Sequence, residues 1–155
     1  MPRIEFRENG IFDSLTGAPT FRFFRSQLER EIALRKRSTE PLSIVTIFVS
    51  RPVDDGEVFM LNQGILRVSR NEDFYCRASE NGFWICLRSD ALGATKASDR
   101  ILKSCTHIFE QISEYGIIEK NDFKIPYIHS EIHEYHGGIS LEKFIEQIDK
   151  KFFAL

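Results

Sequence analysis

A run of eight largely apolar residues, LSIVTIFV from Leu42 to Val49, most restricts what this chain can fold into. The run is short, continuous and rich in β-branched residues, which predicts a strand covered on both faces. A strand of that kind needs a packing layer on each side of its sheet. Eight residues are far fewer than the ~20 that cross a bilayer as a helix, so we expect no membrane insertion.

Four other segments carry apolar residues at the three- and four-residue steps of a helix. Ser140, directly before the last of them, is a predicted N-cap, and Cys105 on the apolar side of the third is interpreted as a core residue. The four segments are about 21–37, 56–69, 97–115 and 141–152, and the second is predicted to bury Val58, Leu61, Ile65 and Leu66.

Two strand-like runs, 73–79 and 83–88, flank the dipeptide Asn81-Gly82. Asn-Gly between alternating residues is a strong signal for a β-hairpin. If these two residues form the turn, Cys76 and Cys86 point to opposite faces of the hairpin and cannot form a disulfide. A turn of another length would reverse that relation, so the assignment depends on the register.

The predicted elements follow the order helix, strand, helix, hairpin, helix, strand, helix, with the last strand at about 123–132. This alternation predicts an α/β or α+β fold with helices packed on a central mixed sheet. A length of 155 residues is typical of one domain. We expect a short lead-in over 1–12 and the domain proper over 13–155.

The charge balance excludes some partners. Twenty-one Lys and Arg against 23 Asp and Glu give a net charge of −2, which argues against a nucleic-acid binder because such proteins cluster basic residues. Three cysteines without a CxxC motif indicate free thiols in a reducing cytoplasm. The opening MPRIEFRENG has no apolar core and does not resemble a signal peptide.

Four motifs in order resemble the GGDEF domains, a bacterial signalling family whose active members are diguanylate cyclases. DSLTG at 13–17 resembles the DxLTG start, PLS at 41–43 the element before the first strand, RASENGF at 77–83 the R-x-GGDEF hairpin, and LEKFIEQIDKKFFAL the closing helix. The resemblance implies a palm-like, nucleotidyl-cyclase-like fold with a central sheet of about five strands. It also implies an ion pair between Asp13 and Arg77.

The sequence departs from that family where active members bind metal and GTP. Phe48 and Asn81 stand where the family has metal-binding carboxylates, and Ser50 replaces a second Asp. Phenylalanine cannot ligate a hard cation, and a neutral amide is a poor substitute for a carboxylate. Ser79 and Glu80 replace the glycines of the phosphate-binding turn. We therefore expect a non-cyclase with no catalytic residue, no cofactor and no metal.

Arg70-Asn71-Glu72-Asp73 matches the family's RxxD motif, which in relatives binds the product, cyclic di-GMP. An Arg fork can bind a phosphate or the O6/N7 edge of guanine, and a carboxylate accepts hydrogen bonds from guanine N–H groups. Arg100 on the next helix is the predicted third member of the site. The resemblance thus implies a cyclic di-GMP receptor that signals to a protein partner. The alternatives are a solvated Arg–Asp ion pair, and a protein-interaction or homodimerisation scaffold.

Three histidines, His129, His133 and His136, form the remaining cluster of candidate ligands. On a helix their spacing would place all three on one face and suggest a transition-metal site. The local pattern is that of a strand and turn, so that only His129 and His133 share a face. We therefore interpret them as surface histidines without a metal.

Overall fold

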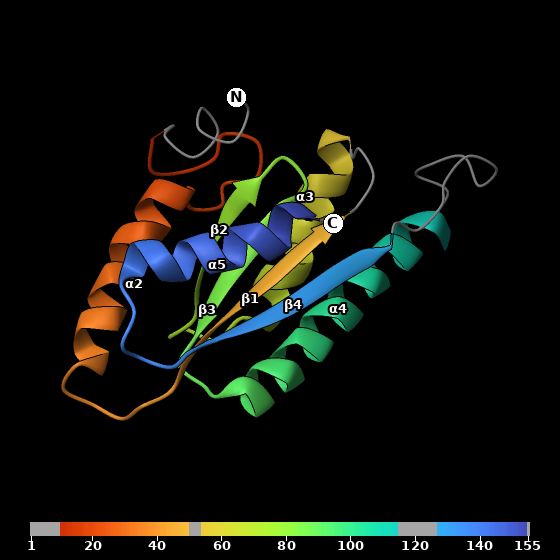
Figure 1. The fold of residues 1–155 in the computed structure, drawn as a ribbon. Helices are drawn as coiled ribbons and strands as arrows, with labels where there is room; N and C mark the ends of the chain where they lie inside the picture. The colour runs from red at the N-terminus through yellow and green to blue at the C-terminus, as the bar shows by residue number, and fades with distance from the viewer. Residues whose placement is uncertain (1–9, 50–53, 115–126, 155) are drawn as a thin grey trace.

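The computed structural model describes residues 10–49, 54–114 and 127–154. Over these ranges its helices and strands follow the predicted order (Figure 1). They are α2 (Phe21–Arg35), β1 (Leu42–Val49), α3 (Asp55–Val68), β2 (Phe74–Ser79), β3 (Gly82–Leu87), α4 (Ala91–Glu114), β4 (Ile128–Tyr135) and α5 (Leu141–Ala154). None of the described helices is long and apolar enough to span a membrane.

The described strands form one sheet of four strands in the order β2-β3-β1-β4, where the resemblance implied about five. Every pairing between them is antiparallel, so the prediction of a mixed sheet is wrong for these strands. The reason is topological, because each helical connection skips one strand position. Helix α3 links β1 to β2 with β3 between them, and α4 links β3 to β4 with β1 between them. Strands that run in the same direction are therefore never neighbours, as in the split β-α-β arrangement.

Strand β1 is buried along its whole length, which confirms the prediction of a strand covered on both faces. Helices α3 and α4 cover one face of the sheet, and α2 and α5 cover the other (Figure 1). Alternate residues of β1 point into the two layers: Val45, Ile47 and Val49 into the α3/α4 layer, and Leu42, Ile44 and Phe48 into the α2/α5 layer. Trp84 of β3 is fully buried in the second layer.

Side-chain caps position the helices. The Thr20 hydroxyl accepts a hydrogen bond from the Phe23 N–H at the start of α2. A capping box, in which Asp54 and Glu57 each bond to the other's backbone N–H, begins α3. Ser140 accepts from the Lys143 N–H at the start of α5, so the predicted N-cap is confirmed.

Helix α3 lies unusually close to α4. A Cβ added to Gly64 would come within 2.6 Å of the Cys105 sulfur and 2.8 Å of its Cα. The predicted burial of Cys105 is confirmed. Val58, Leu61 and Ile65 are buried as predicted, but Leu66 is 48% exposed. Leu66 follows Ile65 by about 100° around the helix, which turns its side chain away from the sheet.

The hairpin register differs from the predicted one. Cys76 pairs with Trp84, and an irregularity between Arg77 and Ser79 precedes the turn. The turn residues are Glu80 and Asn81, and Gly82 already belongs to β3. Cys76 and Cys86 consequently share the α2/α5 face, and neither forms a disulfide. The placement of these cysteines on opposite faces is therefore wrong.

Gly82 occupies its position because of packing and not because of turn geometry. Its φ is not positive, whereas an added Cβ would meet the Phe152 ring at 2.5 Å and the Ile47 carbonyl oxygen at 3.0 Å. The Asn-Gly signal correctly predicted a hairpin and misplaced its turn by one residue.

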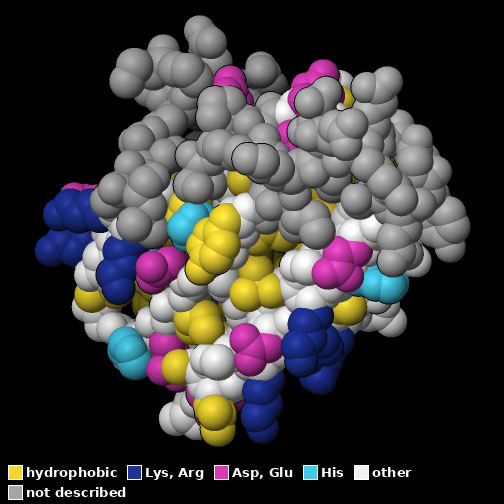
Figure 2. Space-filling view, turned by 90° about the vertical axis from the view of Figure 1, so that its right-hand side faces the viewer, with side chains coloured by type: hydrophobic (Ala, Val, Ile, Leu, Met, Phe, Trp, Pro, Cys, Tyr) yellow, Lys and Arg dark blue, Asp and Glu magenta, His cyan; other side chains and the backbone are white. Residues whose placement is uncertain are grey.

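Strand β4 lies at the edge of the described sheet opposite β2. It runs from Ile128 to Tyr135, three residues beyond the predicted end, and residues 123–126 of the prediction lie outside the described ranges. All its residues are half-buried. Tyr127, just before it, is 73% exposed. On the face over α4 and β4, hydrophobic side chains gather at the centre among scattered charges (Figure 2).

Candidate functional site

The RxxD residues form a tight turn between α3 and β2. The Arg70 N–H donates to the Asp73 carboxylate at 2.9 Å, and the Asp73 N–H donates back to the Arg70 carbonyl at 3.1 Å. This reciprocal pair holds the Asp73 side chain beside the first residue of β2. The Asp73 carboxylate is thus bound to the backbone of Arg70, a local contact of the kind that closes turns.

A second wall faces this turn. It consists of the end of β3 and the first turns of α4, where the Asp90 carboxylate accepts from the Gly93 N–H at 2.8 Å. Between the walls lies a cavity of about 190 Å³. Its lining contains six charged side chains: Arg70, Glu72, Asp73, Arg88, Lys96 and Arg100.

The structure therefore brings together all three residues that the sequence singled out. Arg70 and Asp73 come from one wall, and Arg100 comes from the other, on α4. Two cations of the pocket were missed. Lys96 lies four residues before Arg100, so the helical spacing could have revealed it, whereas Arg88 joins the pocket only through the fold of β3 against β2.

Asp73 experiences two opposing influences in this pocket. Burial raises its pKa above the ordinary carboxyl value, and Glu72 adds to the rise. The hydrogen bond from the Arg70 N–H and the charges of Arg70 and Arg100 act in the other direction, without cancelling it. A half-buried carboxylate that has lost hydration gains from a hydrogen-bond donor supplied by a ligand.

The size of the cavity limits what it can hold. Sites that enclose a drug-sized molecule occupy roughly 300–1,000 Å³, and this pocket has about 190 Å³. It can therefore receive one recognition group, such as the edge of a base or a phosphate, with the rest of a larger ligand outside. Its four cations against two carboxylates favour an anionic group.

The other end of the hairpin is filled with side chains. Phe48 is 2% exposed, stacks on His129 with ring centroids 4.9 Å apart and contacts Phe152 edge to face. The Asn81 side-chain amide donates to the Val49 carbonyl and accepts from the Ser79 hydroxyl. Ser50 lies outside the described residues.

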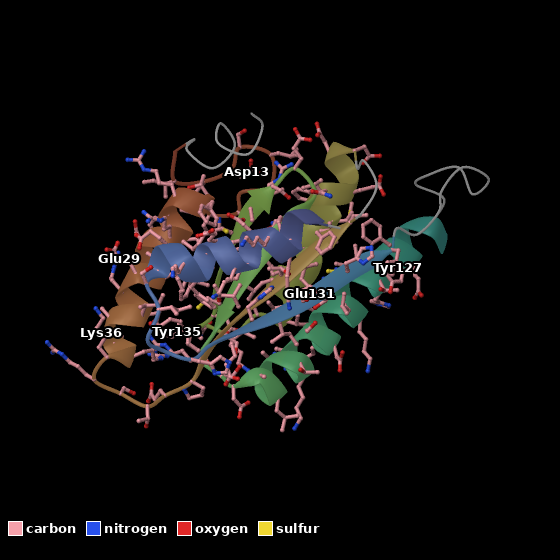
Figure 3. All side chains as sticks on the ribbon, in the orientation of Figure 1. Asp13, Glu29, Lys36, Tyr127, Glu131 and Tyr135 are labelled. Atoms are coloured by element: carbon pink, nitrogen blue, oxygen red, sulfur yellow. The ribbon has the colours of Figure 1, made fainter. Side chains whose placement is uncertain are left out.

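Asp13 and Arg77 form the ion pair that the resemblance implied. The Arg77 guanidinium donates to both carboxylate oxygens of Asp13, at 3.1 and 3.2 Å, and to the Glu80 carbonyl at 3.0 Å. The Thr16 hydroxyl donates to the same carboxylate at 2.6 Å. Asp13 lies near the end of the hairpin (Figure 3), so that the pair ties the segment before α2 to the turn.

The histidines are distributed as the strand pattern predicts. His129, Glu131 and His133 all lie on the face of β4 that is directed towards α5, and His136 follows the strand. Burial lowers the pKa of His133, and nearby Lys151 lowers it further, while Glu131 opposes both. The described part of the chain holds no group of three His, Cys, Asp or Glu side chains placed to bind a metal.

No model of a known protein family matches the sequence, and no curated protein matches it. Several solved structures do match the fold. The GGDEF domain of DgcB from Caulobacter crescentus, solved with c-di-GMP, is 16% identical with a TM-score of 0.70, over 96% of this chain and 91% of that one. The GGDEF domain of YfiN (TpbB) from Pseudomonas aeruginosa is 18% identical with a TM-score of 0.72, over 92% and 87%.

A third similar structure is the diguanylate cyclase SiaD from Pseudomonas aeruginosa, solved with its activator SiaC. It is 15% identical with a TM-score of 0.73, over 94% of this chain and 57% of SiaD. The helices on both faces of an antiparallel sheet agree with these likenesses. The chain has the fold of the GGDEF domains.

Proposed function

We propose that this domain is a catalytically inactive GGDEF-like signalling module that binds cyclic di-GMP through Arg70, Asp73 and Arg100. The observation that carries the proposal is the pocket in which these three residues meet. A bacterial, cytoplasmic setting belongs to the same proposal. Support also comes from the DgcB domain of the same fold, which was solved with c-di-GMP.

The chemistry of the pocket suits one end of that ligand. An Arg fork binds a phosphate or the O6/N7 edge of guanine in a bidentate manner. The Asp73 carboxylate, whose pKa is raised by burial, accepts from the N–H groups of the same base. Cyclic di-GMP carries two phosphates and two guanines, so the cations of the pocket match its charge.

The lack of catalysis is inferred from the filled end of the hairpin. Phosphoryl transfer by two metal ions needs oxygen ligands that position the nucleotide. At the corresponding positions, Phe48 is buried among aromatic rings and the Asn81 amide is bonded to the Val49 carbonyl. The Phe48 ring can ligate no cation, and the Asn81 amide, which donates to the Val49 carbonyl, offers no negative charge to one.

Isothermal titration with cyclic di-GMP tests the proposal. We expect micromolar or tighter binding that Arg70→Ala and Asp73→Ala each weaken by more than about tenfold, since each loses a charge-assisted contact. Arg67→Ala is the matched control, because Arg67 is exposed in the last turn of α3 and does not line the pocket. Absence of binding to the unaltered chain would overturn the receptor function.

Incubation with GTP and Mg²⁺, followed by chromatography of the nucleotides, tests the lack of catalysis. We expect GTP to remain unconverted even when the protein is present in far more than catalytic amounts. Any formation of cyclic di-GMP above that of a heat-denatured sample would overturn this part of the proposal.

A second candidate function, a homodimerisation scaffold, is favoured by one observation on α3. Phe59 and Leu66 are 40% and 48% exposed and lie two helical turns apart on one face. Asp55 begins the helix and Arg67 lies in its last turn. A second copy packed antiparallel would therefore place opposite charges together around the two apolar side chains.

Sedimentation of Leu66→Glu against the unaltered chain separates this candidate from the receptor. A scaffold would dissociate on this change and would be indifferent to Arg70→Ala, Asp73→Ala and cyclic di-GMP. A chain that is monomeric before the change would overturn the scaffold function.

A further inference from the structure

Glu31 of α2 lies between two arginines. Its Oε1 accepts hydrogen bonds from Arg88 Nη2 at 2.6 Å and from Arg88 Nε at 3.2 Å. Its Oε2 is 3.3 Å from Arg35 Nη1. The Glu31 and Arg35 side chains are buried, whereas that of Arg88 is 48% exposed. The bridge joins the end of the hairpin to α2.

Arg88 also lines the pocket that contains Arg70, Asp73 and Arg100. It is therefore shared between the pocket and α2. A guanidinium has five N–H donors in a fixed fork, and Glu31 already uses its Nε and Nη2 atoms. A phosphate prefers the same bidentate geometry as a carboxylate. Three N–H groups of Arg88 remain as donors, but the Glu31 carboxylate holds the guanidinium against α2 and offsets the positive charge that it presents to an anion in the pocket.

We propose that Glu31 competes with a phosphate of the ligand for Arg88, so that this carboxylate on α2 sets the anion affinity of the pocket. The inference rests on the proposed receptor function and names a regulatory contact of that site. By linkage, a ligand that draws Arg88 into the pocket weakens the bridge between β3 and α2 by the same factor. Ligand binding in the pocket therefore changes the contact between Arg88 and α2.

Arg35 allows Arg88 to move from Glu31 to a ligand without leaving Glu31 unpaired. Removing one partner from a buried ion pair normally leaves an uncompensated charge, which is strongly unfavourable. Here Glu31 keeps Arg35 as a buried partner when Arg88 moves. Arg88 itself is half-exposed, so a change in its position does not disturb the core.

Titration of Glu31→Gln with cyclic di-GMP tests the competition. We expect the affinity to rise about tenfold, equivalent to ~1.4 kcal/mol, because the neutral amide holds Arg88 less strongly. Glu29→Gln is the matched control: it makes the same change of charge on an exposed residue of α2 (Figure 3). We expect its affinity to stay within about twofold of the unaltered chain.

Two further variants keep the test decisive. In an Arg88→Ala background, Glu31→Gln should give no gain, since the cation over which they compete is absent. Glu31→Asp keeps the charge beside Arg35 and shortens the side chain by one methylene, so it should also raise affinity. It serves as the second measurement if Glu31→Gln fails to fold, as judged by circular dichroism.

The outcomes separate this inference from the function on which it rests. Binding to the unaltered chain with the same affinity in Glu31→Gln overturns the competition and leaves the receptor in place. A gain that persists without Arg88 also overturns it, because the effect would then be one of net charge. Absence of binding in every variant overturns the receptor itself.

Discussion

The two ends of the β2–β3 hairpin differ in what occupies them. At one end, the RxxD turn and the start of α4 enclose an open, charged pocket. At the other end, Phe48, Phe152 and Gly82 pack without space for an added Cβ. Strands of six residues separate the two ends by roughly 20 Å. One hairpin therefore joins a region with a charged cavity to a region of packed core.

This difference agrees with the proposal that the domain lacks catalysis and binds a ligand through the RxxD turn. Filling the end of β1 with an aromatic ring adds buried apolar contacts, which stabilise the domain. The pocket adds no such stabilisation, because the partial burial of the Asp73 carboxylate is unfavourable. A charged pocket beside a well-packed core supports the proposed binding role. The following changes test the distinction between the pocket and the packed end of the hairpin.

The largest effect is expected from Phe48→Ala. Removing a buried aromatic ring should lower the free energy of unfolding by about 3–5 kcal/mol, through lost contacts and a cavity, as measured by urea denaturation. Phe59→Ala, at a site 40% exposed on α3, should change it by less than about 1 kcal/mol. Equal losses in the two variants would show that the end of β1 is not a packed region.

Gly82→Ala should have the next largest effect. The new Cβ would overlap the Phe152 ring and approach the Ile47 carbonyl, so we expect a loss of about 1–3 kcal/mol in unfolding free energy. Gly56→Ala is the control in the first turn of α3, where the nearest atom is 3.3 Å away. An unchanged Gly82→Ala would mean that α5 moves freely away from the hairpin.

At the pocket, Lys96→Ala should act on binding and not on stability. We expect cyclic di-GMP affinity to fall about tenfold, ~1.4 kcal/mol, and the salt dependence of binding to become weaker, because one cation is lost. The unfolding free energy should stay within about 0.5 kcal/mol. Lys103→Ala, exposed on the same helix and outside the pocket lining, should leave affinity unchanged.

The smallest effect concerns pH. The pKa of His133 is lowered by burial below its ordinary value of 6.5, so the unfolded chain binds its proton more readily than the folded chain. Its contribution to stability is present above pH 6.5 and is lost as the pH falls through the lower, folded value. Denaturation at pH 7 and pH 5 should show a decline that is smaller in His133→Gln. An equal decline in both would contradict the assignment.

Much of the fold followed from local patterns. The burial of LSIVTIFV, the caps at Ser140 and the helical faces depend on residues near one another in the chain, where periodicity is informative. The pairing of Asp13 with Arg77, and the selection of Arg70, Asp73 and Arg100, came from the resemblance in motif order. Leu66 was misassigned because an apolar residue at the border of a helical face can lie on either side of it.

The errors arose where distant segments meet. The turn predicted at Asn81-Gly82 lies one residue earlier, where Gly82 packs against Phe152, a residue seventy positions later. The irregularity between Arg77 and Ser79 reversed the facing of Cys76 relative to Cys86. The sheet is antiparallel between its described strands because both helical connections skip a strand. Neither fact is visible in a local window of sequence.

Composition and local periodicity were sufficient to predict the order of elements, the strand buried on both faces and the residue types available for a site. Contacts between distant segments place Arg88 and Lys96 beside the RxxD turn and pair Glu31 with Arg88. They also enclose Phe48 with rings from β4 and α5. The physical reason is that cavities, ion pairs and aromatic packing are properties of surfaces brought together by folding, which no single segment possesses.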